Sequence, residues 1–224
     1  MTTIDRANRG IGLFGGTFDP VHNGHLTVAR HALDALKLQR LDFVLAPSPW
    51  QKFVTTPPER RVEMLREAIE HEERMQVNLT EVMREGKTYT IDTLRAMREQ
   101  VGPSVPLVLI MGADQWKNFH TWKDWEAFSS LVSIALCNRE KHEPDVCDEA
   151  VRQAWLAGDR EVEPHRIGEK SHGLITRFAV PEHKASSTKI REVFVQMPRD
   201  EAFLMLENWL PVRVAKLIAR LHLY

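Results

Sequence analysis

The chain has 224 residues, 43% of them hydrophobic, and a formal net charge of −1, so it can bury a large core and is no general nucleic-acid binder. No apolar run is long enough to span a membrane, and residues 1–10 lack the apolar core of a signal peptide. Cys137 and Cys147 make neither a disulfide framework nor a zinc pattern, so we expect the protein to be cytoplasmic. Together these features predict a globular protein with no nucleic acid and no membrane as a partner.

The first predicted strand, residues 11–14, leads directly into a glycine-rich turn. Gly15 and Gly16 lack a Cβ, so the backbone amides there can approach a bulky anion closely. Beyond Gly24, apolar residues recur at helical spacing as far as Leu36. This order of strand, turn and helix places helix N–H groups and a positive dipole end beside the turn, which suits a phosphate.

His22 and His25 stand three residues apart where this helix is expected to begin. Two imidazoles beside a phosphate-sized hollow can donate hydrogen bonds to oxygens that gain charge during a reaction. The same two residues could instead cap the helix and pack against it. The surrounding glycines, Asp19 and Pro20 favour the chemical role.

Strand and helix signals alternate along most of the remaining chain. Strands are predicted at 42–46, 76–82, 106–111, 131–136 and 176–180, and helices at 59–69, 88–100, 151–156, 188–195, 199–206 and 211–221. This alternation predicts an α/β fold with a doubly wound parallel sheet and a small C-terminal helical part. We assign residues 1–184 to the core, with a less regular excursion at about 140–173, and residues 185–224 to the helical part of the same single domain.

Ligands of such sheets bind beyond the carboxyl ends of the strands, and the loops with unusual residues are predicted to lie there. The proline-bearing loop 47–58 carries Lys52, and residues 112–122 carry Asp114 and Trp122. Lys52 suits a phosphate, although lysine is also common at solvent-exposed positions. The shared place of these loops after strands predicts one common site.

Residues 12–26 resemble the G-G-x-F-D-P-x-H-x-G-H signature of the nucleotidyltransferase superfamily and match it at every fixed position. The resemblance implies a Rossmann-like nucleotidyltransferase fold that binds ATP. Residues 185–191 resemble the superfamily's I-S-x-T-x-x-R motif, with Ala185 in place of the usual isoleucine; alone, they could be a capped helix with two solvated basic residues. The resemblance assigns ATP binding to Gly15, Gly16, Thr17, Phe18, His22, Gly24, His25, Gly112, Asp114, Ser186, Ser187, Thr188 and Arg191.

The middle of the chain indicates a narrower family. Residues 89–94 resemble the Y-T-x-D-T-L segment of bacterial nicotinate-nucleotide adenylyltransferases, and residues 111–122 resemble their G-x-D…W segment. Residues 210–212 and 223–224 resemble the C-terminus of that family, and the match is weakest from 140 to 173. The family implies adenylyl transfer from ATP to nicotinate mononucleotide in NAD biosynthesis, which gives nicotinate adenine dinucleotide and pyrophosphate.

The same resemblance assigns the mononucleotide site. Trp122 would stack on the pyridine ring, although at least one of Trp116, Trp122 and Trp125 must serve as core packing. The helix start at Thr90 would receive the nicotinate carboxylate, and Asp114 would accept hydrogen bonds from a ribose or else cap a helix. The substrate-binding residues are then Gly16, Lys52, Tyr89, Thr90 and Trp122.

Catalysis is expected from His22, His25, Lys52 and Arg191, which would position the reacting phosphates and stabilise their charge. Mg²⁺ is expected to arrive with ATP, because the sequence offers no dedicated carboxylate cage. Around Lys52 the sequence Trp50-Gln51-Lys52 departs from the family's Pro-x-x-x-Pro-His-Lys pattern, so the contacts of this loop stay open.

Other activities stay open at this stage. A related enzyme could act on nicotinamide mononucleotide or on 4′-phosphopantetheine, and residues 89–94 argue against the second. A class I tRNA synthetase-like protein would need an aminoacyl site and a tRNA-binding domain, which this length and charge do not obviously provide. A nucleotide-binding regulator without turnover would not need His22, His25 and Arg191. An oligomer is compatible with each alternative.

Overall fold

The structure, a computed structural model, describes residues 10–47, 56–84, 86–139 and 147–224. The strands in these ranges are β1 (Ile11–Gly16), β2 (Arg40–Leu45), β3 (Met75–Asn78), β4 (Leu107–Gly112), β5 (Ser133–Arg139) and β6 (Ile175–Val180). The α-helices are α1 (Asn23–Ala35), α2 (Pro58–Ile69), α3 (Thr90–Val101), α4 (Ala113–Lys117), α5 (Glu149–Leu156), α6 (Ser187–Gln196), α7 (Arg199–Met205) and α8 (Val212–Leu221). Short 3₁₀ helices are η2 (Phe119–Thr121), η3 (Trp125–Ser130) and η4 (Pro164–Glu169). Among the residues described, no helix has the length and apolar character needed to cross a bilayer.

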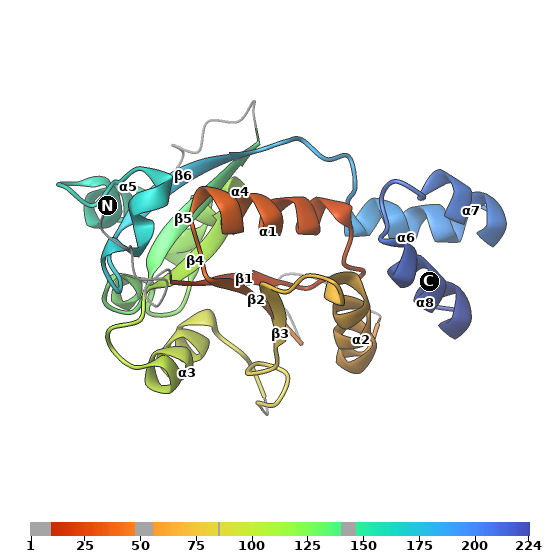
Figure 1. Cartoon of the computed structure of the whole chain (residues 1–224), viewed down its shortest axis with the longest axis horizontal. Helices are drawn as coiled ribbons and strands as arrows, with labels where there is room; N and C mark the ends of the chain where they lie inside the picture. Colours follow the sequence, from red (N-terminus) through yellow and green to blue (C-terminus); the bar gives the residue numbers. More distant parts are fainter. Residues whose placement is uncertain (1–9, 48–55, 85, 140–146) are drawn as a thin grey trace, which may run out of the picture.

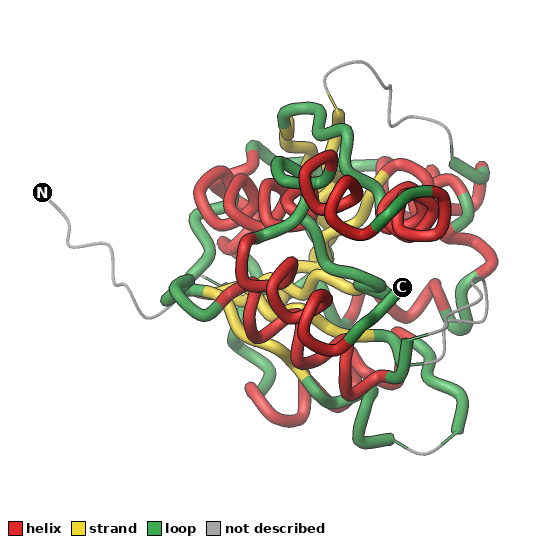
Figure 2. Tube along the Cα trace, turned by 90° about the vertical axis from the view of Figure 1, so that its right-hand side faces the viewer, coloured by secondary structure: helices red, strands yellow, loops and turns green. Residues whose placement is uncertain are grey.

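The strands form one parallel sheet in the order β3-β2-β1-β4-β5-β6. Figure 2 shows the strands in the middle of the molecule with helices on both sides. The predicted doubly wound parallel sheet is therefore confirmed. β1 and β4 are neighbours in the sheet, and the chain winds outward from them in opposite directions, so the strand order reverses between their carboxyl ends.

Each face of the sheet has its own hydrophobic core. On one face, Leu33 of α1 and Leu65 of α2 belong to the same buried cluster. On the other face, Leu94 of α3 and Trp155 of α5 belong to a second cluster. Residues 107–111 of β4 contribute alternately to the two clusters, which explains why this strand is apolar without interruption.

The C-terminal helices α6, α7 and α8 gather at one end of the molecule, away from α5 (Figure 1). Ile190 of α6 and Leu217 of α8 join the cluster that also holds α1 and α2. At the surface, Arg213 of α8 pairs with Glu67 of α2 at 2.8 Å. The helical part therefore extends the core of the sheet on the face of α1 and α2.

The predicted bounds of the strands differ from the structure by one to four residues, and two of the differences have a clear cause. β3 ends at Asn78 and not at residue 82, because the side-chain oxygen of Asn78 accepts the backbone N–H of Thr80 at 2.9 Å and starts a turn. β5 begins at Ser133 and not at residue 131, because the N–H of Val132 still donates to the carbonyl of Phe128 at 2.9 Å. In both cases local hydrogen bonds override the β-propensity of apolar residues.

The irregular segment contributes to both cores. Between residues 147 and 173, α5 buries Val151 and Trp155 against the face of α3. The 3₁₀ helix η4 buries Ile167 in the cluster on the opposite face. The described part of this segment is thus packed onto the sheet and its helices.

A buried arginine binds the loops beyond β1 and β2. Arg61 lies in the first turn of α2 and is fully buried. Its guanidinium donates to the carbonyl oxygens of Thr17 at 2.9 Å, Ala46 at 2.8 Å, Pro47 at 2.5 Å and Thr56 at 3.0 Å. Burial lowers the pKa of Arg61 from its usual, very high value. An arginine guanidinium stays charged in proteins, and the four carbonyl oxygens replace the water that would otherwise hydrate it.

We predict that Arg61→Met lowers the free energy of unfolding by about 3–5 kcal/mol, because it leaves buried carbonyl oxygens without donors. Urea unfolding followed by circular dichroism measures this change. The matched control is Arg60→Met, since Arg60 lies at the surface and pairs there with Glu63 at 2.9 Å; we expect it to cost less than about 1 kcal/mol. Equal losses in both variants would contradict a special role for Arg61.

Candidate active site

The carboxyl ends of β1 and β4 form an open cradle at the point where the strand order reverses. Gly15 lies near the end of β1 and Gly112 ends β4. A Cβ built on either glycine would meet no heavy atom within 4 Å. A ligand could therefore lie directly against the backbone here, as expected for the carboxyl edge of a doubly wound sheet.

Phe18 fixes the turn that follows β1. Its backbone has a φ of 50°, in the left-handed region that residues other than glycine rarely adopt. Its buried ring packs edge-on against Phe14 and His25, with centroids at 5.8 and 5.0 Å. A Cβ on Gly16 would come within 2.7 Å of that ring, so Gly16 leaves room for Phe18. Packing thus offsets a local strain of about 1–2 kcal/mol.

His22 and His25 meet at the start of α1. His22 is the buried N-cap residue, and His25 lies in the first turn. The His22 backbone N–H donates to Nδ1 of His25 at 3.3 Å, and the two rings stack with centroids 3.7 Å apart. Since Nδ1 of His25 accepts a hydrogen bond, the proton of the neutral ring belongs on Nε2. Nε2 of His25 is then a donor suited to a phosphate oxygen.

Gly24 lies against the ring of His22, at the N-cap of α1. A Cβ at residue 24 would lie 3.1 Å from both Nδ1 and Cε1 of His22. A side chain at residue 24 would therefore require the His22 ring to shift by a few tenths of an ångström. This contact gives a structural reason for the glycine between the two histidines.

The second motif lies directly against the first. Ser187 Oγ donates to the carbonyl of Pro20 at 2.9 Å. Arg191 Nη1 donates to the carbonyl of Asp19 at 2.6 Å. The structure therefore brings residues about one helical turn apart on α6 to the loop that precedes His22. Ser186 is the N-cap residue of α6, Thr188 is exposed in its first turn, and Thr17 is bound through its carbonyl to Arg61.

A second group of predicted residues surrounds the start of α3. Tyr89 is the N-cap residue, and its carbonyl accepts the N–H groups of Asp92 and Thr93 at 3.0 and 3.3 Å. Lys123 Nζ lies 4.6 Å from the centroid of the Tyr89 ring and 3.3 Å from Asp92 Oδ2. These contacts tie Lys123, the residue after Trp122, to the helix start at Thr90.

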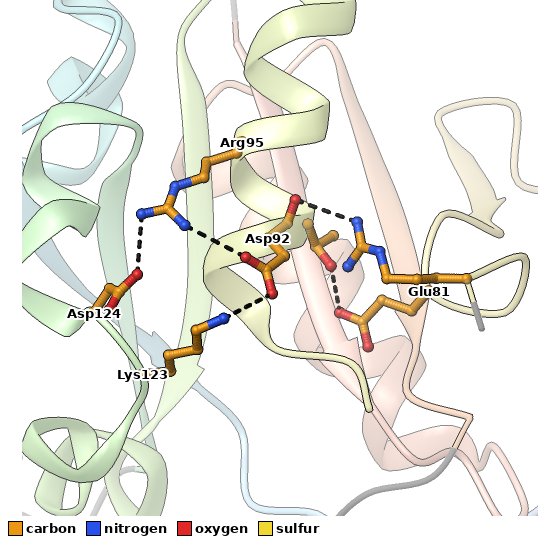
Figure 3. A network of polar contacts seen from close by, with 7 residues as sticks. Glu81, Asp92, Arg95, Lys123 and Asp124 are labelled. Carbon is orange, nitrogen blue, oxygen red and sulfur yellow. Dashed lines mark hydrogen bonds and ion pairs between the residues drawn. The ribbon is translucent and has the colours of Figure 1, made fainter. Parts of the chain in front are cut away.

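Figure 3 shows a polar network around the first turn of α3. Asp92 pairs with Lys123 and with Arg95 at 3.4 Å, and Arg95 also pairs with Asp124 at 3.0 Å. On the other side, Glu81 is buried and accepts the hydroxyl of Thr93 at 2.9 Å. Burial raises the pKa of Glu81, against the opposing effect of this hydrogen bond. The carboxylate of Asp92 is thus paired with Lys123 and Arg95, and that of Glu81 accepts a hydrogen bond from Thr93.

The three neighbouring tryptophans have different surroundings. Trp116 is fully buried, so the expected packing role falls on this residue. Trp122 is half-buried and packs edge-on against Phe119 and Phe128, with centroids at 5.6 and 6.1 Å. Trp125 is also half-buried and packs against Phe119. Trp122 therefore has part of its surface available for a ligand and a rigid support behind it.

Two other predicted residues differ in how they are placed. Asp114 lies exposed in the first turn of α4, directly after Gly112. It therefore borders the open cradle, with its backbone carbonyl accepting the side chain of Asn118 at 3.2 Å. Lys52 belongs to 48–55, which lies outside the described residues, as do Trp50 and Gln51.

A resident metal does not fit the described side chains. No cluster of three or more His, Cys, Asp or Glu that could hold a cation occurs in the described ranges. Mg²⁺ often binds through substrate phosphates and water with few protein carboxylates.

Comparison with known proteins agrees with this geometry. The Cytidylyltransferase-like family matches residues 13–193. A protein of Marinobacter nauticus named "Probable nicotinate-nucleotide adenylyltransferase" is 35% identical over 80% of this chain and 82% of its own length. A protein of the same name from Herminiimonas arsenicoxydans is 32% identical over 96% of this chain and 97% of its own. The chain belongs to the nicotinate-nucleotide adenylyltransferase family.

A solved structure supports the fold of this adenylyltransferase family. Plasmodium falciparum nicotinic acid mononucleotide adenylyltransferase, complexed with NaAD, has a TM-score of 0.68 to this chain. The two chains are 16% identical, and the match covers 96% of each.

Several residues of this family member were not anticipated as part of the site. Arg61 falls four residues before Leu65, on the apolar stripe of α2, and a charge in that stripe is a signal of a buried role. Asp19 was visible in the signature, but its burial and its contacts were not. The pairing of Lys123 with Asp92 joins distant segments and leaves no sequence signal.

We predict that Gly24→Ala keeps α1, because alanine favours helix, but displaces the ring of His22. The measurement is a ¹H–¹⁵N NMR spectrum of the histidine rings, in which the His22 and His25 signals should shift while the melting temperature changes little. Gly112→Ala is the matched control, because its new Cβ would meet no atom within 4 Å. Unchanged ring signals in Gly24→Ala would contradict the steric role of this glycine.

Proposed function

We propose that this protein transfers the adenylyl group of ATP to nicotinate mononucleotide and releases pyrophosphate. The observation that carries the proposal is the stacked pair of His22 and His25 at the point where the strand order reverses, in a chain of the nicotinate-nucleotide adenylyltransferase family. The product is nicotinate adenine dinucleotide, an intermediate of NAD biosynthesis.

The reaction needs no nucleophile from the protein. An oxygen of the mononucleotide 5′-phosphate forms a bond to the α-phosphorus of ATP, and the bond from that phosphorus to the bridging oxygen of pyrophosphate breaks. The attacking group is already an anion, so the protein has to align the two phosphates and stabilise the charge that develops. Positioned hydrogen-bond donors in a preorganised site do this efficiently.

In this proposal, His22 and His25 bind the α-phosphate and the leaving oxygen. Nε2 of His25 donates a hydrogen bond, since its Nδ1 already accepts one from the backbone of His22. Gly15 and Gly112 leave the backbone accessible to the nucleotide, while Gly16 makes room for Phe18 and Gly24 for His22. Thr17 and Phe18 belong to the turn that follows β1. Asp114, which borders the cradle, would accept hydrogen bonds from the ribose of ATP.

The leaving pyrophosphate would lie at the start of α6. Ser187 and Arg191 contact the signature loop, and Ser186, Thr188 and the first N–H groups of α6 belong to the same helix start. Arg191 contributes a guanidinium suited to two phosphate oxygens. Arg191 uses one N–H on the carbonyl of Asp19, which orients the rest of the group. Lys52 would add a further cation. Mg²⁺ would enter as the MgATP complex and neutralise part of the phosphate charge.

The nicotinate group would bind at the start of α3. The N–H groups there and the positive helix end favour a carboxylate, with Trp122 stacked on the ring and Tyr89 beside it. Asp92 would oppose a negative ligand, but Lys123 and Arg95 pair with its charge. A cytoplasmic location remains a prediction.

We predict that His25→Ala lowers kcat by about 10²–10⁴ while binding of ATP changes much less, because a donor aimed at developing charge acts mainly in the transition state. Release of pyrophosphate measures turnover, and calorimetry measures ATP binding. His31→Ala is the control, since His31 lies on the same helix and bonds the carbonyl of Thr27 at 2.9 Å. Wild-type turnover in a folded His25→Ala protein would remove this mechanism.

We predict that kcat/KM for nicotinate mononucleotide exceeds that for nicotinamide mononucleotide by a factor on the order of 10²–10⁴. The amide would direct its NH₂ donors at helix N–H donors and lose a charge-assisted hydrogen bond, at about 1–3 kcal/mol for each mismatch. Steady-state kinetics with both mononucleotides measure the ratio. Comparable values would leave adenylyl transfer intact but rule out a carboxylate site at Thr90.

The stacking role of Trp122 has its own comparison. Trp122→Ala should raise KM for both mononucleotides, because both contain the pyridine ring. Trp125→Ala is matched in size and lies in the same aromatic group, and we expect it to leave the KM values close to wild type. Equal effects of the two variants would place the ring elsewhere.

A further inference from the structure

A tyrosine from the far end of the chain reaches the signature loop. The hydroxyl of Tyr224 donates to Oδ1 of Asp19 at 2.6 Å, across a sequence separation of 205 residues. Asp19 is only 2% exposed, so this hydrogen bond forms away from bulk water. The phenol therefore joins the C-terminal part to the loop after β1 at the carboxyl edge of the sheet.

The position of Tyr224 is determined by contacts along its whole length. Its ring stacks on Phe194 of α6, with centroids 6.1 Å apart and planes at 22°. Its backbone carbonyl accepts a hydrogen bond from Nη1 of Arg199 at 3.1 Å, and Nη2 of Arg199 donates to Ile218 of α8 at 3.1 Å. Three C-terminal helices thus hold the phenol against Asp19.

Asp19 is where the tail and the two motifs converge. Its carboxylate accepts the Tyr224 hydroxyl, and its backbone carbonyl accepts Arg191 Nη1 at 2.6 Å. Pro20, the next residue, accepts Ser187. His22 follows, so a shift of Asp19 would move the guanidinium of Arg191 and the first histidine together.

We propose that Tyr224 is a positioning residue of the catalytic site, whose hydroxyl holds Asp19 and thereby sets the placement of Arg191 and His22. This inference rests on the proposed function at the histidine pair. Tyr224 acts through Asp19 and not on the substrate. Its hydroxyl stays protonated over the working pH range, because burial and the hydrogen bond to Asp19 both raise the pKa of Tyr224 far above neutrality.

Tyr224→Phe tests the proposal because it removes the hydroxyl and keeps the ring on Phe194. We expect kcat to fall by about 10- to 100-fold, since small displacements of positioned groups cost rates of this order. KM for ATP and for nicotinate mononucleotide should stay within about twofold, because the hydroxyl contributes to alignment and not to binding. A wild-type kcat in folded Tyr224→Phe, or a change confined to KM, would overturn the proposal.

Leu221→Ala is the matched control for loss of packing in the C-terminal part. Leu221 is half-buried at the end of α8 and packs on the same core cluster. Thermal unfolding should show a decrease in this variant at least as large as in Tyr224→Phe, while its kcat stays at the wild-type value. A parallel fall of kcat in both variants would assign Tyr224 to stability alone and overturn the positioning role.

A double variant tests whether Asp19 is the intermediary. If the hydroxyl acts through this carboxylate, Asp19→Ala/Tyr224→Phe should be no slower than Asp19→Ala alone. Additive losses would mean that Tyr224 acts by another route and would overturn the proposal. The wild-type assay separates this result from the proposed function: no pyrophosphate release from ATP and nicotinate mononucleotide would refute that function before any variant is compared.

Discussion

The buried guanidinium of Arg61 holds the ligand-binding edge of the sheet in place, because one side chain binds carbonyl oxygens from the loops after β1 and β2 and from the residue before Pro57. A charge in the core costs several kcal/mol unless its N–H groups find acceptors. Here the four acceptors are all backbone carbonyl oxygens. Arg61 therefore holds the described ends of these loops through the backbone of Thr17, Ala46, Pro47 and Thr56.

The histidine site depends on small residues as much as on the reactive ones. Gly16 leaves room for the ring of Phe18, and Gly24 leaves room for the ring of His22. The rings of His22 and His25 stack, and the hydrogen bond from the His22 backbone N–H to Nδ1 leaves Nε2 as the donor nitrogen of neutral His25. Many positions of this motif are restricted in residue type because the turn, the helix start and the hydrogen-bond donors all lie within one short segment.

The sequence was sufficient to predict the sheet, since hydrophobic period and turn residues are local signals. It overextended β3 because the turn at Asn78 depends on one side-chain hydrogen bond. Arg61 could have been recognised from its place on an apolar stripe. The bond between Tyr224 and Asp19 could not, because contacts at such separation follow from the fold and not from spacing.

The separation between Asp19 and Tyr224 also has a consequence for how the protein matures. Contacts between residues that are far apart in sequence form late, because closing a long loop costs entropy before the contact is gained. A chain synthesised only as far as β6 already contains both histidines but neither Arg191 nor Tyr224. Nucleotide chemistry would therefore begin only when the C-terminal helices have docked, and a nascent or partly unfolded chain would be kept from turning over ATP.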